Sequence, residues 1–226
     1  MYFSQCGQDR FLDQEIFQGY RRGVFVEVGA WDGVDLSNTV FFERERGWTG
    51  LAIEPLPDRY RQLVANRTCD SLNVAISDVE GDAEFLSISG PTSMLSGLVS
   101  TYHPRHVVRI DREAAELGAT KTTLRVPTRR LDSIFREKGL TRIHYLSIDV
   151  EGAEFECLRS IDFNAVYIDI IGFEDNYPET TAPILDYLNA RGYTILKRSP
   201  GECFMIRTGS PFSPRKLPKL PLFKLR

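Results

Sequence analysis

The fold is decided by Val24-Phe25-Val26-Glu27-Val28-Gly29-Ala30-Trp31-Asp32-Gly33, a short apolar run that ends in an acid and two glycines. Short runs of β-branched and aromatic residues favour a buried strand. Gly29 and Gly33 permit backbone angles, or close approaches, that a Cβ would forbid. Apolar positions among the charges of residues 36–47 predict that a helix follows and presents its N-terminus to the turn. This order is typical of a strand that feeds a nucleotide-binding turn.

A second predicted strand, residues 50–53, ends at Glu54. Its carboxylate falls about 20 residues beyond the glycines, the spacing at which an acid at a strand end meets the hydroxyls of a bound ribose. Two cofactors suit this geometry. A dinucleotide fingerprint reads G-x-G-x-x-G, but Trp31 stands in place of the middle glycine. Glu27 would repel a pyrophosphate and attract the sulfonium and α-amino group of S-adenosylmethionine, so the stretch favours that cofactor. An ordinary β-turn-α unit, with glycines for packing alone, is the other alternative.

Length and composition indicate one soluble globular domain. The 226 residues, 42% hydrophobic and 26% charged, exclude disorder and are ordinary for an α/β enzyme. We expect a single domain over residues 1–210, with a lid or insertion at about 87–120 and a basic, proline-rich tail at 211–226. No apolar run approaches the roughly 18 residues that span a bilayer, and residues 1–5 lack the features of a signal peptide. These observations predict a cytoplasmic protein.

The basic tail has two interpretations. Residues 214–226 combine Lys and Arg with Leu, Phe and Pro and contain no acid, and the proline spacing excludes a regular helix. The segment is either a basic tail without regular structure or a weak contact with an anionic membrane surface. The rest of the chain is net acidic, so we expect no nucleic-acid partner. The oligomeric state is not determined by the sequence.

Cysteine and histidine spacing excludes a zinc site. No C-x-x-C pair occurs, and reduced thiols are expected at Cys6, Cys69, Cys157 and Cys203. His144 precedes an apolar strand and is expected to be structural. His103 and His106 bracket Pro104-Arg105 in a region without clear periodicity, which makes both candidates for a role toward substrate.

Apolar periodicity predicts the remaining elements. Helices are expected near residues 11–17, 55–64, 130–135, 152–158 and 182–190. Strands are expected near 72–76, 83–86, 122–127, 144–149 and 166–171, with an antiparallel pair at 193–196 and 203–206. This alternation predicts a mostly parallel sheet covered on both faces, with chemistry at the carboxyl ends of its strands. Residues 87–120 lack a clean period, and substrate choice is expected there.

A second constellation lies in Ser147-Ile148-Asp149-Val150-Glu151-Gly152-Ala153-Glu154. Asp149 at the strand tip and Glu151 two residues later can point to the same side. They could orient an acceptor hydroxyl, accept its proton, or hold a divalent cation such as Mg²⁺. Glu154 is expected to complement the helix N-terminus instead. The polar residues 174–177, after the strand predicted at 166–171, either position the acceptor or form a solvated loop.

These motifs together resemble the FkbM family of S-adenosylmethionine-dependent methyltransferases, over residues 4 to about 206. The segments that carry the resemblance are Ser4-Gln5-Cys6-Gly7-Gln8-Asp9, residues 25–33, Ala52-Ile53-Glu54-Pro55, Asn73-Val74-Ala75-Ile76-Ser77 and residues 146–154. Family members often carry an aromatic residue where this chain has Cys6.

The resemblance implies O-methyl transfer to a hydroxyl of a sugar, glycan or natural product. It implies an α/β Rossmann-like fold with a seven-strand, mostly parallel sheet, helices on both faces and an antiparallel closing hairpin. The implied cofactor-binding residues are Glu27, Gly29 and Asp32 at the methionine end, with Ala30, Trp31 and Gly33 in the same turn, Glu54 and Pro55 at the ribose, Ala75, Ile76 and Ser77 at the adenine, and Asp149. The acceptor is not implied, because such enzymes differ most in the insertion.

Two other functions compete with this interpretation. A module that binds S-adenosylmethionine without turnover is disfavoured by the presence of both Glu27 and Glu54. A nicotinamide-dependent oxidoreductase is disfavoured by Trp31. We therefore expect an O-methyltransferase in which Asp149 and Glu151 act as base or metal ligands, with His103 or His106 as the alternative catalytic group.

Overall fold

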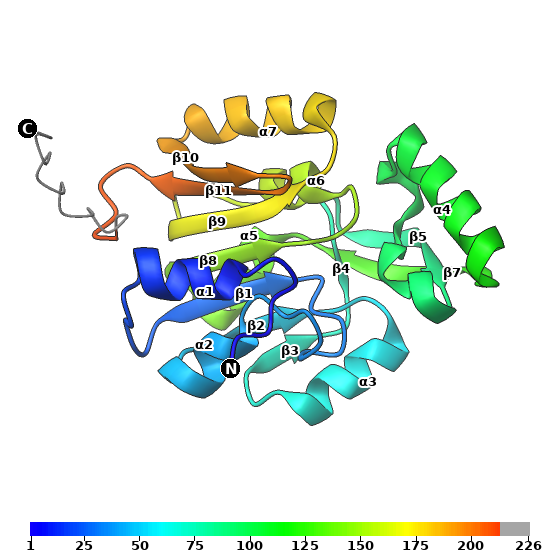
Figure 1. Cartoon of the computed structure of the whole chain (residues 1–226). Helices are drawn as coiled ribbons and strands as arrows, with labels where there is room; N and C mark the ends of the chain where they lie inside the picture. The colour runs from blue at the N-terminus through cyan, green and yellow to red at the C-terminus, as the bar shows by residue number, and fades with distance from the viewer. Residues whose placement is uncertain (213–226) are drawn as a thin grey trace, which may run out of the picture.

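A seven-stranded sheet in the order β10-β11-β9-β8-β1-β2-β3 forms the centre of the structure (Figure 1). The structure is a computed structural model that describes residues 1–212. The strands are β1 (Val24–Val28), β2 (Thr49–Ile53), β3 (Asp70–Leu72), β8 (Arg142–Ile148), β9 (Tyr167–Asp175), β10 (Tyr193–Ser199) and β11 (Gly201–Arg207). The first five are parallel, and β11 is antiparallel to both β9 and β10. The predicted fold class and closing hairpin are confirmed.

Helices cover both faces of this sheet. They are α1 (Gln8–Phe11), which continues into the π-helix η1 (Leu12–Ile16), α2 (Val40–Arg46), α3 (Pro57–Asn66), α5 (Leu131–Lys138), α6 (Glu154–Arg159) and α7 (Pro178–Asn189). On one face α5, α6 and α7 pack on Val26, Val28 and Leu146. On the other, η1 and α2 pack on Phe25 and Tyr145. Alternate residues of β1 therefore enter two different cores, as the pleat requires.

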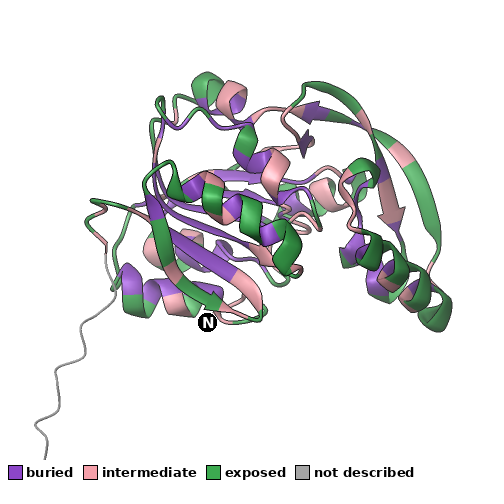
Figure 2. Ribbon diagram, turned by 90° about the horizontal axis from the view of Figure 1, so that it is seen from above, coloured by how far each residue is buried: buried purple, intermediate pink, exposed green. Residues whose placement is uncertain are grey.

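A second, four-stranded sheet stands beside one end of the first (Figures 1 and 2). It has the order β4-β7-β5-β6 and consists of β4 (Ala75–Ile76), β5 (Gly81–Ile88), β6 (Gly97–Leu98) and β7 (Lys121–Arg129). The long antiparallel pair β5–β7 carries η2 (Gly90–Leu95), η3 (Val99–Thr101) and α4 (Pro104–Leu117) between its strands. Residues 87–120 thus form the outer part of this sheet unit.

The single strand predicted over residues 72–76 is wrong. The chain forms β3 beside β2, and then leaves the central sheet to form β4 beside β7. The change occurs at Asn73, whose Nδ2 donates to the carbonyls of Glu54 (2.8 Å) and Pro55 (2.9 Å). A side chain that binds two carbonyls of a neighbouring segment fixes a bend that an apolar pattern does not encode.

Residues 87–120 are more regular than their sequence predicts, because they contain the 14-residue helix α4. Its buried residues His106, Ile110 and Ala114 occur at every fourth position and face the rest of the unit. Because His106 is polar, the sequence pattern does not identify it as one of the buried positions of a helix. Gly118, in the left-handed conformation with φ 68°, ends the helix.

Other predicted features shift by several residues. The helix expected over residues 36–47 begins only at Val40, so residues 30–39 form a long loop. Strand β9 extends to Asp175, which puts Glu174 inside the sheet opposite Glu202 of β11 and contradicts, for this residue, the alternative of a solvated loop. His144 is structural, as predicted: it is buried and its Nδ1 accepts from the backbone N–H of Val24 (2.9 Å). All four cysteines are free.

Within residues 1–212, no helix has both the length and the apolar character needed to cross a bilayer. The basic tail and the proposed membrane contact of residues 214–226 lie outside the described residues.

Candidate functional site

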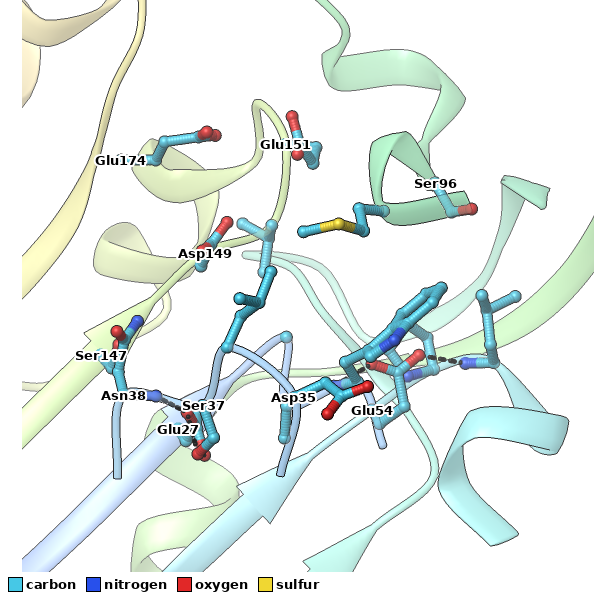
Figure 3. Close-up of a pocket in the computed structure, with 18 of the residues that line it drawn as sticks. Glu27, Asp35, Ser37, Asn38, Glu54, Ser96, Ser147, Asp149, Glu151 and Glu174 are labelled. Atoms are coloured by element: carbon cyan, nitrogen blue, oxygen red, sulfur yellow. Dashed lines mark hydrogen bonds between the residues drawn. The ribbon is translucent and has the colours of Figure 1, made fainter. Parts of the chain in front are cut away.

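A pocket opens at the carboxyl ends of β1, β2, β8 and β9. Its lining combines the turn after β1, the loop before α2, the end of β8 and parts of the second sheet. The lining residues are Gln5, Glu27, Gly29, Ala30, Trp31, Asp35, Leu36, Ser37, Asn38, Glu54, Pro55, Leu56, Phe85, Met94, Ser96, Ser147, Asp149, Val150, Glu151 and Glu174. In Figure 3 the acids Asp149, Glu151 and Glu174 lie at one end and Glu54 at the other.

Glu27 holds the loop before α2. Its Oε1 accepts from the Asn38 backbone N–H (2.7 Å), and both of its oxygens accept from the Ser37 hydroxyl at 2.9 and 3.0 Å (Figure 3). Its Oε2 also accepts from Thr39 Oγ1 (2.7 Å) and pairs with Arg67 Nη1 (3.1 Å). The carboxylate is therefore already neutralised and hydrogen-bonded by the protein. A direct contact between Glu27 and the sulfonium remains a prediction. In the structure, Glu27 fixes the position of Ser37 and Asn38, which line the pocket.

Asn38 presents an unpaired acceptor on that wall. Its Nδ2 donates to Ser147 Oγ (3.1 Å), while its buried Oδ1 has no partner among residues 1–212. A buried acceptor without a donor costs free energy unless a ligand supplies one. An ammonium group is such a donor.

Of the residues predicted in the turn, Gly29, Ala30 and Trp31 line the pocket, whereas Asp32 and Gly33 do not. Asp32 Oδ1 accepts from the backbone N–H groups of residues 34 (2.9 Å) and 35 (2.8 Å), so it shapes the turn. A Cβ on Gly33 would lie 2.7 Å from Cγ of Arg67, so this glycine permits close packing behind the pocket. The prediction that these two residues contact the cofactor is not supported.

Gly29 is required by a close approach between strands. Its φ is 85°, and a Cβ would lie 1.8 Å from the carbonyl oxygen of Asp149. The ends of β1 and β8 therefore meet with no room for a side chain.

Glu54 is a buried carboxylate at the other end of the pocket. Its Oε2 accepts from the backbone N–H of Trp31 (2.9 Å) and its Oε1 from that of Leu56 (2.8 Å). Burial raises the pKa of Glu54 to about 7, against the lowering effect of these two bonds. Each oxygen keeps a second lone pair, so the carboxylate can still accept from two hydroxyls.

The predicted adenine-flanking residues lie beside the main pocket. Ala75 and Ile76 line a smaller apolar cavity of about 280 Å³, which shares Gly29, Pro55, Phe85 and Val150 with the pocket. Ser77 lines neither cavity, because the chain has by then entered the second sheet, where its N–H donates to the Arg129 carbonyl (3.1 Å). The adenine assignment of Ala75 and Ile76 stays a prediction, and that of Ser77 is not supported.

Three carboxylates gather at the acidic end. Asp149, Glu151 and Glu174 each offer an oxygen within 4.8 Å of the other two. Burial, followed by the charge of Glu27, raises the pKa of Asp149 to about 6. Burial and the charge of Asp149 raise the pKa values of Glu151 and Glu174 well above their usual range. The negative charges thus disfavour one another's ionisation.

Glu154 has the structural role predicted for it. Its Oε1 accepts from the backbone N–H groups of Gly152 (3.1 Å) and Val150 (3.4 Å), in the turn that leads into α6. Burial raises its pKa to about 7.

Neither candidate histidine lines the main pocket, but both line a smaller cavity beside it, together with Glu151 and Glu174. His106 is 2% exposed, and its Nε2 lies 3.4 Å from Glu151 Oε2. The Nδ1 of His103 accepts from the Arg105 backbone N–H (3.2 Å) at the start of α4, and its ring stacks on Tyr177. Its Nε2 pairs with Glu179 (3.2 Å), so the predicted catalytic role of His103 is not supported.

Sequence analysis missed several lining residues. Leu36, Ser37 and Asn38 fall in the helix predicted over residues 36–47, Asp35 directly precedes it, and Met94 and Ser96 fall in the predicted insertion. The signal for the first group was present in Ser37-Asn38-Thr39, since Ser and Asn before an apolar run mark a helix start. Nothing in the sequence indicated that Met94 and Ser96 would face the pocket.

The architecture and the site define a class. A seven-strand sheet with an antiparallel hairpin at one edge, a glycine turn after β1 and an acid at the end of β2 are the features of a Rossmann-like methyltransferase domain. Residues 27–195 match the Methyltransferase FkbM domain family. The chain belongs to that family, which implies S-adenosylmethionine as the methyl donor.

The solved structures that match this chain are distant in sequence. Methyltransferase FkbM from Methylobacillus flagellatus KT is 13% identical with a TM-score of 0.47, and the match covers 83% of this chain and 44% of that one. Precorrin-6y C5,15-methyltransferase from Geobacter metallireducens GS-15 is 11% identical, with a TM-score of 0.43 and coverages of 83% and 79%. Human methyltransferase 10 domain containing protein is 10% identical, with a TM-score of 0.40 and coverages of 82% and 70%. The chain thus spans less than half of the Methylobacillus structure. No curated protein sequence matches it.

The residues present fit S-adenosylmethionine. Glu54 can accept from the ribose hydroxyls, and the unpaired Oδ1 of Asn38 can accept from the α-ammonium group. Both side chains line the same pocket, which also includes the glycine turn.

We predict that Glu54→Gln weakens S-adenosylmethionine binding by about 1.5 to 3 kcal/mol, because hydroxyls donate more strongly to a charged acceptor. Isothermal titration calorimetry measures the change, and the exposed Asp58→Asn on α3 is the control. An unchanged dissociation constant for the Glu54 variant would exclude the ribose assignment.

A second prediction concerns stability and pH. Folding raises the pKa of Glu54 from 4.5 to about 7, so the folded state binds this proton more tightly than the unfolded state. The resulting stabilisation is complete below about pH 4.5 and is lost as pH rises to about 7. The free energy of unfolding of the wild type, measured with urea, should therefore fall relative to Glu54→Gln across this window, by up to about 3 kcal/mol. A constant difference between the two proteins would contradict the assignment.

Proposed function

We propose that this protein is an S-adenosylmethionine-dependent O-methyltransferase that acts on a hydroxyl of a sugar, glycan or small natural product. The observation that carries the proposal is one pocket with two chemically different ends. Glu54 and Asn38 suit the donor, and the carboxylates of Asp149 and Glu151 suit a hydroxyl that must lose its proton.

When bound, S-adenosylmethionine supplies a sulfonium methyl group that is open to in-line attack. Asp149 and Glu151 orient the acceptor hydroxyl toward that methyl group by accepting its hydrogen bond. As the new O–CH₃ bond forms and the S–CH₃ bond breaks, Asp149 takes the hydroxyl proton, and S-adenosylhomocysteine is the second product. Orientation alone can remove several kcal/mol from the barrier.

Asp149 is the better base of the pair. Its pKa of about 6 leaves it ionised at neutral pH and more basic than an ordinary aspartate, which favours proton transfer. Glu151 is more strongly disfavoured in its charged form, because burial and the neighbouring acids, Asp149 first among them, raise its pKa further. His106 contacts Glu151 rather than the pocket, so its part in catalysis is that of a positioning residue.

A divalent cation such as Mg²⁺ at Asp149 and Glu151 is the other way to activate the hydroxyl, since a bound cation lowers the pKa of an oxygen ligand. Glu174 joins these two carboxylates, so the donor set differs from the pair predicted from sequence.

A protein that binds S-adenosylmethionine without turnover would need the end of the pocket that contains Glu54. It would not need the unpaired acids at the opposite end of the pocket. The acidic cluster therefore favours the enzyme. Trp31, whose ring lies under the guanidinium of Arg59 (3.9 Å) at the pocket, disfavours a nicotinamide dinucleotide.

Asp149→Asn should lower methyl transfer by about 100-fold or more, because the general base is lost, and leave the affinity for S-adenosylmethionine nearly unchanged. Release of S-adenosylhomocysteine, with hydroxylated acceptors and labelled donor, measures the rate. The exposed Asp186→Asn on α7 should behave as the wild type. Wild-type turnover by the Asp149 variant would remove this residue from the mechanism.

Residues 87–120 are proposed to select the acceptor and to close over it. They are held to the main sheet by contacts at the start of α4, including Arg105 with Glu179 and His106 with Glu151. The Arg105–Glu179 pair is exposed and contributes little, so opening of the segment mainly requires the buried contact of His106 with Glu151 to separate. Hydrogen exchange should show it less protected than β1 and β8, with protection gained only when donor and acceptor are both present. Equal, high protection in all states would show that residues 87–120 are a fixed part of the structure and do not close over the acceptor.

A further inference from the structure

The acidic end of the pocket lacks the positive charge that its carboxylates need. Within residues 1–212, no lysine or arginine forms an ion pair with Asp149, Glu151 or Glu174; the one ion-pair contact is that of Glu151 with His106. Arg109 lowers the pKa of Glu151 through its field, but its Nε donates to Glu113 (2.8 Å). By contrast, Glu27, on the adjacent strand β1, is paired with Arg67. Three half-buried acids that lie this close together without a cationic partner are stabilised when a proton or a cation binds among them.

A second and independent observation is the unsatisfied face of His106. Its side chain is buried, and neither its Nε2 nor Glu151 Oε2 has a hydrogen-bond partner in the described part of the chain, although the two atoms lie 3.4 Å apart. His106, Glu151 and Glu174 also line a second cavity beside the pocket, so these unpaired atoms lie next to space that a ligand could occupy.

The spacing of the carboxylates suits one ion. Two oxygens that are each about 2.1 Å from a metal lie about 3.0 Å apart at right angles and about 4.2 Å apart on opposite sides. The three oxygens here lie within 4.8 Å of one another, so small side-chain rotations bring all three onto one centre. Three carboxylates form a hard donor set, which suits Mg²⁺ or Mn²⁺ better than zinc.

We propose that Asp149, Glu151 and Glu174 bind a divalent cation of the Mg²⁺ or Mn²⁺ type, and that His106 positions Glu151 from behind. The site is built by two segments: the connection between β8 and α6, which carries Asp149 and Glu151, and the end of β9, which carries Glu174. Helix α4 supplies His106 from the second sheet unit, so the cation would also tie residues 87–120 to the central sheet. This inference deepens the proposed function, since the ion would lie at the acceptor end, but cation binding itself does not depend on methyl transfer.

The test is a titration of the full chain with Mn²⁺ alone, followed by electron paramagnetic resonance, in which bound Mn²⁺ loses the signal of the free ion. We expect one saturable site per chain. Glu174→Gln and Glu151→Gln, which keep the shape of each side chain, should each weaken binding by about tenfold or more. Glu202→Gln is the matched control, because Glu202 lies opposite Glu174 in β11 and also has a raised pKa, of about 7, yet belongs to no carboxylate triad.

Saturable binding that both triad variants weaken and the control retains supports the site. No saturable binding up to about 1 mM Mn²⁺, or equal loss in Glu202→Gln, overturns it, since the latter shows only the effect of overall charge. Circular dichroism confirms that each variant is folded. Methyl transfer is assayed separately: Mn²⁺ binding without transfer to any hydroxyl acceptor supports the site and counts against the proposed function.

Discussion

The guanidinium of Arg67 holds the donor side of the pocket together. This side chain, fully buried at the end of α3, donates to Glu27 Oε2 (3.1 Å), Glu43 Oε2 (2.6 Å), Thr39 Oγ1 (2.9 Å) and the carbonyl of Gly33 (3.0 Å). One planar donor group therefore joins β1, the loop after it, α2 and α3. Its fork geometry allows this where a lysine could not. Removal of one partner from such a buried network costs about 3 to 5 kcal/mol, because the remaining charge is left unpaired.

Neutralised charge on one side contrasts with unpaired charge on the other. Glu27 and Asp149 occupy the ends of adjacent parallel strands, yet the first is paired with Arg67 and the second has no cation beside it. The pocket wall near Glu27 is consequently held in place by paired charges and hydrogen bonds. At Asp149, burial and neighbouring acids keep proton affinity high, which is what a base or a cation site needs. The same edge of one sheet thus provides both a structural and a reactive carboxylate.

The second sheet unit completes the pocket. Phe85, Met94 and Ser96 come from this unit and face residues of the central sheet across the cavity. Its attachment depends on Asn73, which bends the chain out of the central sheet, and on contacts at the start of α4. A site shared between two sheet units can change width by movement of one of them, whereas the strand ends that hold the donor stay fixed.

Local sequence determined the strand and turn of residues 24–33, the acid Glu54, the strand that ends at Asp149 and the closing hairpin. Each depends on short-range rules: apolar alternation, glycine freedom and the order of strands and helices. These rules also sufficed for the fold class. They could not show that Glu27 pairs with Arg67, 40 residues away in sequence, or that Glu174 joins Asp149 and Glu151. Such contacts form where parallel strands deliver their carboxyl ends to one edge, and their order in the sheet, β9 beside β8 beside β1, is set by packing of the whole chain. The sequence likewise indicated a reactive loop residue at His106. Only the burial of one face of α4 shows that His106 is a buried side chain in contact with Glu151. The sequence alone specified which chemical groups stand at strand ends, and the tertiary structure decided which of them meet, because the charge and burial of each depend on neighbours from distant segments.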